Sequence, residues 1–264
     1  MAEQWVTGTV RLKIAGQPRE IEMTVPATPV KPQRMLPILQ MVTNSLVNES
    51  VSGSAAAGEP ISCKAGCGAC CRQPVPVTEV EMYHLAELVE SMPKPRRSRI
   101  RKRFADAVQH FDRIDWFDRL DAAVHDRPGE EDGSGGKRRV ELALEYFREG
   151  IACPFLEDES CSIHPDRPLA CREYVVTSPA ENCSHPTGET VRLLKLPAKP
   201  SLSLAGLGKR STNGNPSMMI MVRALDLAQQ FPEDYPKRTG PEWMQDFFDR
   251  MGSGGSASSP RQGP

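Results

Sequence analysis

Eight cysteines are the residues of this 264-residue chain best suited to chemistry, and they fall into two groups of four. The first group lies within nine residues, with the spacing C-x3-C-x2-C-C: Cys63, Cys67, Cys70 and Cys71. The second group has longer gaps, which only folding can close: Cys153, Cys161, Cys171 and Cys183. Gly66 and Gly68 allow the positive dihedral angles and close backbone approach that a loop wrapped around a metal needs. The pattern predicts that both groups are metal ligands.

The sequence leaves the identity of the metal open. Zinc and iron–sulfur clusters both accept four thiolates. Paired C-x2-C motifs are the usual zinc signal, and this chain has one such pair, which favours an iron–sulfur cluster over zinc. A redox dithiol or a disulfide framework is a third alternative. Because Cys70 and Cys71 are adjacent, we do not expect both to face one tetrahedral metal. Either each joins a different site, or one supports the site without binding.

A histidine close to the second group is an alternative ligand. His164 lies three residues after Cys161 and could replace a thiolate. The competing interpretation is that it caps the turn before Pro165 or pairs with Asp166. The sequence favours this second, structural role.

Two arginines flank Cys171 and are our candidate cofactor-binding residues: Arg167 and Arg172. A guanidinium near a thiolate offsets its negative charge and lowers the pKa of the thiol. The same group also suits an anionic substrate or the carboxylate of a cofactor. Ordinary ion pairs with Glu173 or Asp166 are the alternative, and the sequence does not separate the two roles.

The cysteine segments resemble a cysteine-cluster family described as a zinc- or iron-chelating domain. The resemblance covers roughly residues 60–185 and rests on CxxxCxxCC, on CPFL at 153–156 and on CSIHPDRPLACREY at 161–174. A relative of this family is the flagellin lysine N-methylase, which implies that the fold can host methyl transfer from S-adenosylmethionine. His164 stands where many relatives carry tyrosine, which leaves the role of that position open.

The first three cysteines also satisfy the spacing of radical S-adenosylmethionine enzymes, C-x3-C-x2-C. In those enzymes three cysteines hold a four-iron cluster, and a barrel of alternating strands and helices follows. Here the residue before Cys70 is Ala69 rather than the common aromatic, and a fourth cysteine follows at once. The next segments have helical patterns, so this alternative is disfavoured.

The apolar share is ordinary for a soluble protein, and the length suits one domain of moderate size or a domain with substantial extensions. A net charge of −1 predicts no general attraction to nucleic acid or membrane. We see no signal peptide and no run of eighteen apolar residues, so we expect a cytoplasmic location. Disulfides are disfavoured there, which favours metal as the role of the cysteines.

Seven basic residues crowd into ten positions of a predicted helix: Lys94, Arg96, Arg97, Arg99, Arg101, Lys102 and Arg103. Nucleic-acid binding is one interpretation of such a run. However, five aspartates follow on the same helix, and aromatic residues are not interleaved with the basic ones. The pattern therefore favours a solvated helix face over nucleic acid as a partner.

The elements that must position the cysteines have clear patterns. Alternating apolar residues over 5–14 and 19–25 predict a β-hairpin with one buried face. Helices are predicted over 33–47, with Pro37 in the first turn, and from a capping box at Thr78–Glu81 to about residue 92. Further helices are predicted over the ranges 96–124, 138–148, 216–230 and 242–251, with a strand over 189–196 and flexible segments at 50–60 and 126–137.

We therefore predict an α+β protein, mainly helical and metal-centred, with a small N-terminal β-hairpin. The predicted divisions are a hairpin and helix at 1–58, a cysteine-cluster domain at 59–186, a C-terminal strand and helices at 187–251, and a disordered tail at 252–264. The first hypothesis for function is a metal-chelating protein with an iron–sulfur cluster or zinc, as a redox component with a redox partner. The second is a methyltransferase that acts on lysine of a protein substrate and uses S-adenosylmethionine. The third is a structural zinc module that binds a partner.

Overall fold

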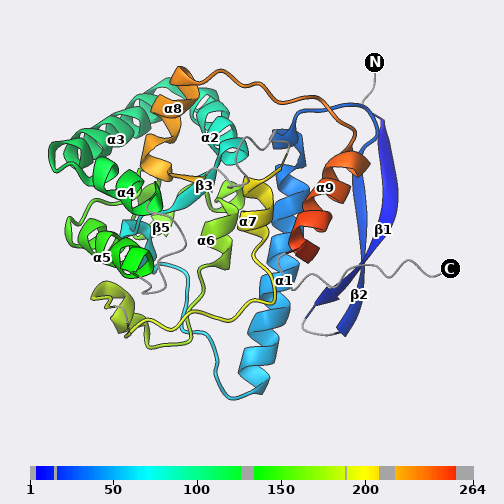
Figure 1. Ribbon diagram of the computed structural model, residues 1–264, viewed down its shortest axis with the longest axis horizontal. Helices are drawn as coiled ribbons and strands as arrows, with labels where there is room; N and C mark the ends of the chain where they lie inside the picture. The colour runs from blue at the N-terminus through cyan, green and yellow to red at the C-terminus, as the bar shows by residue number, and fades with distance from the viewer. Residues whose placement is uncertain (1–3, 15–16, 126–133, 188, 208–217, 254–264) are drawn as a thin grey trace.

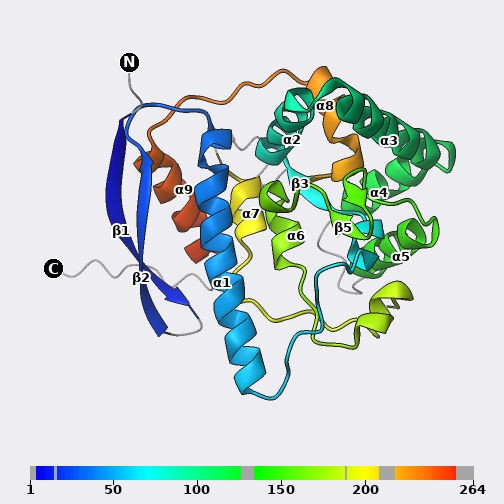
Figure 2. The same cartoon turned by 180° about the vertical axis from the view of Figure 1, so that it is seen from behind.

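The computed structural model describes residues 4–14, 17–125, 134–187, 189–207 and 218–253 (Figure 1). It is an α+β fold that is mainly helical, as predicted. The N-terminal hairpin, α1 and α9 lie on one side of the molecule, and the helices α2 to α5 and α8 lie on the other, as the view from behind also shows (Figure 2). None of the described helices is long and apolar enough to cross a membrane.

The predicted hairpin is confirmed as β1 (Trp5–Ile14) and β2 (Gln17–Pro26), which pair antiparallel. Its buried face is smaller than predicted. Met23 and Val25 on β2 are buried, whereas Val6, which pairs with Val25, is 41% exposed. The reason is that α9 (Gly240–Ser253) packs against β2, and β1 lies outermost (Figure 1).

Helix α1 (Leu36–Ala56) begins with Pro37 in its first turn, as predicted, but it is longer than the sequence indicated. The prediction of a flexible segment over 50–60 was wrong for its first half, because α1 continues to Ala56. Serine hydroxyls in this part of the helix bond back to carbonyls one turn earlier: Ser50 Oγ donates to Leu46 O at 2.9 Å. The chain then enters the cysteine segment without regular structure.

The capping box at the start of α2 (Glu79–Ser91) is confirmed and has a second role. Thr78 Oγ1 accepts from the backbone of Glu81, and the Glu81 carboxylate accepts from the backbone N of Thr78. The other oxygen of Glu81 accepts from Leu169 N at 2.7 Å. Burial raises the pKa of Glu81, and these hydrogen bonds oppose that shift. Glu81 thereby joins α2 to α6 (Leu169–Glu173), the helix that carries Cys171.

The single helix predicted over 96–124 is wrong. The structure has α3 (Lys94–Arg113) and α4 (Trp116–His125), separated at Asp115, which has a φ of +53°. The break lets Trp116 pack beside Phe111, whose ring stacks on Tyr146 of α5 (Ser134–Arg148) with centroids 4.0 Å apart. Burial of this aromatic cluster stabilises the turn.

Short elements complete the fold: β3 (Pro76–Thr78), β4 (Leu156–Glu157), β5 (Ser160–Cys161), α7 (Pro200–Ala205), β6 (Met218–Ile220) and α8 (Ala224–Gln230). The predicted strand over 189–196 is wrong, since that segment makes one isolated bridge, Val176 to Leu193. The predicted helix over 216–230 is regular only from Ala224, and residues 216–217 lie outside the described part. So do residues 126–133 of the predicted loop and residues 254–264 of the predicted tail.

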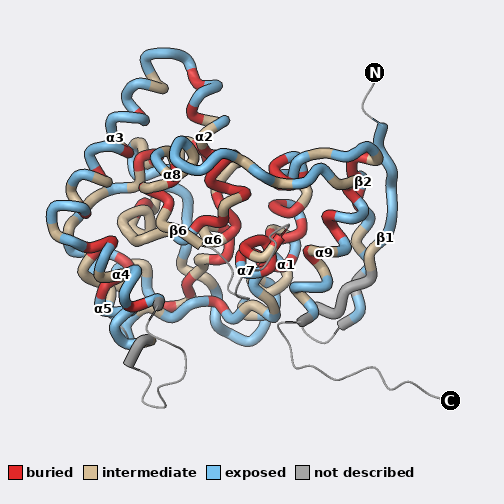
Figure 3. The backbone as a smooth tube through the Cα atoms, turned by 45° about the horizontal axis from the view of Figure 1, so that its top comes forward, coloured by how far each residue is buried: buried red, intermediate tan, exposed pale blue. Residues whose placement is uncertain are grey.

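Among the described residues, three clusters of buried apolar side chains form the core, and buried segments run through the middle of the molecule (Figure 3). One cluster joins the hairpin to α1, α7 and α9. The aromatic residues of α3, α4 and α5 form another. The third contains Phe155 and Ile163, and Cys153 and Cys161 pack against it. This last cluster is the base on which the second cysteine group is fixed.

Replacement of Gly240 is expected to test the docking of α9 on the hairpin. A Cβ at Gly240 would lie 2.6 Å from Val25 Cβ and 2.7 Å from Pro26 O. We expect Gly240→Ala to lower the free energy of unfolding by about 1–3 kcal/mol, because the backbone must shift. Gly53→Ala in α1 is the matched control: the position is open, and helix propensity predicts a gain of about 0.5–1 kcal/mol. Urea denaturation measures the free energy of unfolding of both variants. Equal changes in the two variants would contradict the close contact at Gly240.

Candidate metal centre

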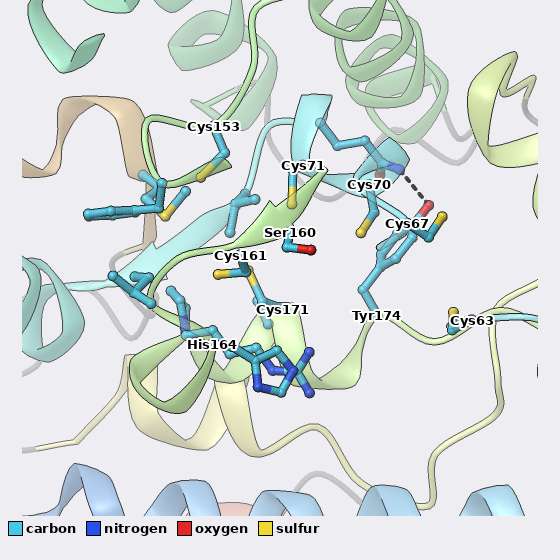
Figure 4. A pocket seen from close by; sticks show the side chains of 18 of the residues that line it. Cys63, Cys67, Cys70, Cys71, Cys153, Ser160, Cys161, His164, Cys171 and Tyr174 are labelled. Carbon is cyan, nitrogen blue, oxygen red and sulfur yellow. Dashed lines mark hydrogen bonds between the residues drawn. The ribbon is translucent and has the colours of Figure 1, made fainter. Parts of the chain in front are cut away.

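Seven of the eight cysteines line one pocket of about 580 Å³, and they come from both groups (Figure 4). They are Cys63, Cys67, Cys70, Cys71, Cys153, Cys161 and Cys171. The eighth, Cys183, is buried and lies outside this lining. The structure thus brings together thiols that are separated by about eighty residues of sequence.

The first group is carried by a glycine-containing loop and a 3-10 turn, Ala69–Arg72. Gly66 has a φ of +77°, as the loop was predicted to require. At Gly68 the absence of a side chain lets the second cysteine segment approach the backbone closely. A Cβ there would lie 2.6 Å from a carboxylate oxygen of Glu159 and 2.8 Å from Leu156 Cδ1. The two cysteine segments therefore meet at Gly68.

Two cysteines of the second group lie on regular elements, Cys161 on β5 and Cys171 on α6, and Cys153 lies just before β4. Asp158 and Glu159 form the turn of the β4–β5 hairpin with φ values of +48° and +55°. Cys153 N donates to Cys71 O at 2.6 Å, which joins the segment before β4 to the first group. Cys171 lies on α6, which Glu81 holds in place.

Two arginines of the basic run donate hydrogen bonds to the second cysteine segment, a role that the sequence did not predict. Arg96 Nη2 donates to Ser162 O at 3.2 Å. Arg103 Nη1 donates to both Pro154 O and Leu156 O at 3.1 Å. The interpretation of a wholly solvated face therefore needs correction at these two positions. No sequence signal could have found them, because their partners are main-chain carbonyls.

Cys183 lies beside the first group rather than its own. It belongs to a 3-10 turn, Ala180–Ser184, that contacts the turn carrying Cys70 and Cys71. Burial raises the pKa of Cys183, and the negative charges of Cys63 and Cys67 add to that shift. The backbone upstream of Cys183 also reaches the first group, because Val176 N donates to Cys63 Sγ at 3.4 Å.

Burial dominates the electrostatics of most of these thiols. It raises the pKa of Cys153 to about 12, and it raises the pKa of Cys171 well above the ordinary value. The hydrogen bond with Cys71 is the main cause of the raised pKa of Cys70, with burial second. These thiols are protonated at neutral pH without metal, so metal binding must release protons.

The predicted cofactor-binding arginines occupy different places. Arg167 lines the pocket, and its charge opposes the burial that raises the pKa of Cys161. Within the described chain its Nε is buried without a hydrogen-bond partner. Arg172 lies outside the lining: its Nε donates to Arg167 O at 3.0 Å and its Nη1 to Asn44 Oδ1 at 3.1 Å.

His164 also lines the pocket. The nearby guanidinium of Arg167 is the main cause of its lowered pKa, with burial second. The proposed partner Asp166 lies instead 3.7 Å from His84 Nε2. Neutral imidazole is the form that binds metals, so this environment suits an alternative ligand.

The side chains of the pocket are suitable ligands for a soft metal. However, the thiols line a cavity and do not converge on one position. Across the described residues, no three Cys, His, Asp or Glu side chains stand in the compact arrangement that holds an ion. Thiolate sulfur is the preferred ligand of zinc and of iron–sulfur clusters. Metal binding is therefore expected to draw the two cysteine segments closer together.

An ion pair joins these segments at the rim of the pocket. Arg72 Nη2 and Nη1 donate to the two carboxylate oxygens of Glu159 at 2.7 and 3.0 Å, and Nη1 also donates to Gly68 O at 3.0 Å. We expect Arg72→Gln and Glu159→Gln to accelerate metal release by roughly tenfold, as for residues that orient metal ligands.

Chelator competition measures these release rates. The double variant is expected to release metal no faster than either single one, because both lose the same interaction. Lys102→Gln is the matched control, since Lys102 pairs with Asp106 at 2.7 Å on an exposed helix face. Additive effects of the two substitutions would contradict the role of the pair.

Comparison with known proteins supports this site. Residues 62–189 match the family model "CxxCxxCC: Putative zinc- or iron-chelating domain". The matched segment contains all eight cysteines and covers a little under half of the chain. No curated protein and no solved structure matches the chain. The match supports chelation of zinc or iron as the function of this region.

Proposed function

We propose that this protein binds an iron–sulfur cluster through the thiolates of the pocket and acts as a redox component. The observation that carries the proposal is the convergence of seven cysteines from two distant segments on one cavity of about 580 Å³. A structural zinc ion is closed in by four ligands at about 2.3 Å and needs far less space. The cavity therefore favours a group of several atoms over one zinc ion.

The surroundings of the cavity suit such a group. Phe155, Ile163 and Met221 give it apolar walls, and Arg167 supplies a positive charge that offsets thiolates. Val176 N already donates to a cysteine sulfur, Cys63 Sγ. Burial, charge and hydrogen bonds to sulfur are the factors by which a protein sets a cluster potential. When bound, a cluster would supply one-electron transfer to a redox partner.

A second candidate function rests on Arg167. Its guanidinium lines the pocket, and its buried Nε has no partner in the described part of the chain, so it could bind a carboxylate. S-adenosylmethionine carries a carboxylate, which keeps methyl transfer to a protein lysine as the alternative. Calorimetry with S-adenosylmethionine on metal-loaded protein tests it. Binding that is lost in Arg167→Gln but kept in Arg99→Gln would support this alternative.

Anaerobic purification followed by metal and acid-labile sulfide analysis tests the first proposal. Iron with matching sulfide and a broad visible band near ~400 nm, typical of thiolate-bound clusters, is the expected result. Zinc without sulfide would contradict the cluster and support a structural zinc module. Protein that holds neither metal after reconstitution would contradict chelation itself.

A further inference from the structure

A hydrogen bond inside the pocket joins the two elements that carry cysteines, and its partners are Gln73 and Tyr174. Gln73 directly follows the 3-10 turn Ala69–Arg72, which holds two cysteines of the first group. Tyr174 directly follows α6, three residues after Cys171. Gln73 Nε2 donates to the hydroxyl oxygen of Tyr174 at 2.8 Å, and both side chains line the pocket with the thiols (Figure 4). The bond therefore fixes the position of the Tyr174 hydroxyl in the pocket.

The direction of this hydrogen bond leaves the hydroxyl proton of Tyr174 for another acceptor. A tyrosine hydroxyl has one proton to donate and lone pairs that accept. Gln73 occupies a lone pair and makes no use of the proton. A hydroxyl that accepts one hydrogen bond is also a stronger donor, because the two bonds polarise each other. Tyrosine keeps its proton at neutral pH, and burial raises the pKa of Tyr174 further.

Sulfur is the commonest side-chain acceptor that the pocket offers to this proton, since seven cysteines line it. Figure 4 shows the Tyr174 side chain pointing toward the part of the pocket where Cys67 and Cys70 lie. The lining also contains the carboxylate of Glu159, but both of its oxygens accept from Arg72. The Tyr174 hydroxyl is therefore placed to donate to sulfur.

We propose that Tyr174 donates its hydroxyl proton to a sulfur of the bound centre, and that Gln73 positions the hydroxyl for this bond. The inference rests on the proposed iron–sulfur cluster and adds a residue that sets its potential. Hydrogen bonds to sulfur stabilise the reduced, more negative form of a cluster and so raise its reduction potential. Val176 N, two residues further along the chain, donates to Cys63 Sγ at 3.4 Å and acts in the same direction.

Redox titration of the cluster-loaded chain tests the proposal. Dithionite supplies one electron to the cluster, and the proton stays on the Tyr174 oxygen. Tyr174→Phe keeps the ring and removes the hydroxyl, so we expect iron and sulfide contents equal to those of the wild type. The equilibrium constant of one-electron reduction is expected to fall about tenfold, which lowers the potential by about 59 mV. Tyr83→Phe is the matched control: Tyr83 lies outside the pocket lining and donates to Phe231 O at 2.9 Å, so the potential should not change.

Resonance Raman spectroscopy gives a second measurement, which a change in packing would not reproduce. An O–H group that donates to sulfur exchanges its proton for deuterium, so the iron–sulfur stretching bands of the wild type should shift in D2O. Part of this shift should be absent in Tyr174→Phe and present in Tyr83→Phe. Equal shifts in the wild type and Tyr174→Phe would show that the hydroxyl does not bond to sulfur and would overturn the proposal.

Gln73→Leu tests the positioning role and decides the matter if Tyr174→Phe binds less iron. The potential is expected to fall by less than in Tyr174→Phe, because the hydroxyl remains but loses its partner. The double variant should have the potential of Tyr174→Phe alone, since Gln73 acts through the hydroxyl, and additive shifts would overturn its positioning role. Unchanged potentials in both single variants would overturn this inference and leave the cluster intact. A wild type without a cluster would overturn the proposed function, and this inference with it.

Discussion

Removal of the metal is expected to lower the free energy of unfolding by at least about 5 kcal/mol, since structural metal contributes roughly 10–16 kcal/mol in small metal-dependent domains. The cysteine segments have little other regular structure: three 3-10 turns, a hairpin of two two-residue strands and the five residues of α6. Burial raises the pKa of Cys153 and Cys171, so these thiols are protonated without metal and the bonds to metal have no replacement in the apo protein. Denaturant titration of loaded and stripped protein measures the difference.

The loss is expected to be local. The cluster that joins the hairpin to α1 and α9 contains Trp243, Phe247 and Leu39, all buried and none near a cysteine in sequence. Hydrogen exchange should therefore increase over 60–76 and 150–187 and stay low in α1 and α9. Return of the metal should restore protection. Equal stability and equal exchange in both forms would contradict a metal that holds the two segments together.

Phe155→Ala is expected to cost about 3–5 kcal/mol of stability, the range for truncation of a buried phenylalanine. Phe155 is fully buried, lies two residues after Cys153 and contacts Phe104 edge-to-face with ring centroids 5.4 Å apart. Because Cys153 and Cys161 pack against the same cluster, the cavity left behind should also weaken metal retention. Thermal or urea unfolding gives the first effect, and chelator competition gives the second.

Phe231→Ala is the matched control for this prediction. Phe231 is 57% exposed, and the same truncation there is expected to change stability by less than about 0.5 kcal/mol. Phe155→Leu should fall between the two, because leucine fills part of the cavity. A Phe155→Ala protein as stable as the control would show that the base of the second cysteine group does not depend on this side chain.

The features that the sequence predicted correctly are those set by neighbours along the chain. The capping box needs only Thr78 and Glu81, three residues apart, and both of its hydrogen bonds are present. Pro37 fits the first turn of α1 because the first helical N–H groups have no partner in any helix. Alternation of apolar residues gave the pairing of β1 with β2. The family resemblance likewise rests on local spacing, which the matched segment 62–189 supports.

The features that were missed depend on contacts between distant residues. The break at Asp115 is favoured by the packing of Trp116 on Phe111 and Tyr146, which outweighs the helical pattern of the segment. Arg103 donates hydrogen bonds to main-chain carbonyls that lie about fifty residues away in the sequence. Spacing along the sequence groups Cys183 with the other three cysteines of the second group, whereas in the fold Cys183 lies beside the first group. Tertiary contacts decide such features, and one sequence does not encode them in its spacing.

Extended X-ray absorption fine structure at the edge of the bound metal tests most directly whether the pocket thiols are the ligands. The predicted result for anaerobically isolated protein is iron with a first shell of sulfur alone and a second shell of iron. A sulfur-only shell at about 2.3 Å around zinc would still identify the thiolates as ligands, but the bound group would then be a zinc ion and not a cluster. A first shell dominated by nitrogen or oxygen would contradict the assignment of the cysteines as ligands, and with it the function proposed for this protein.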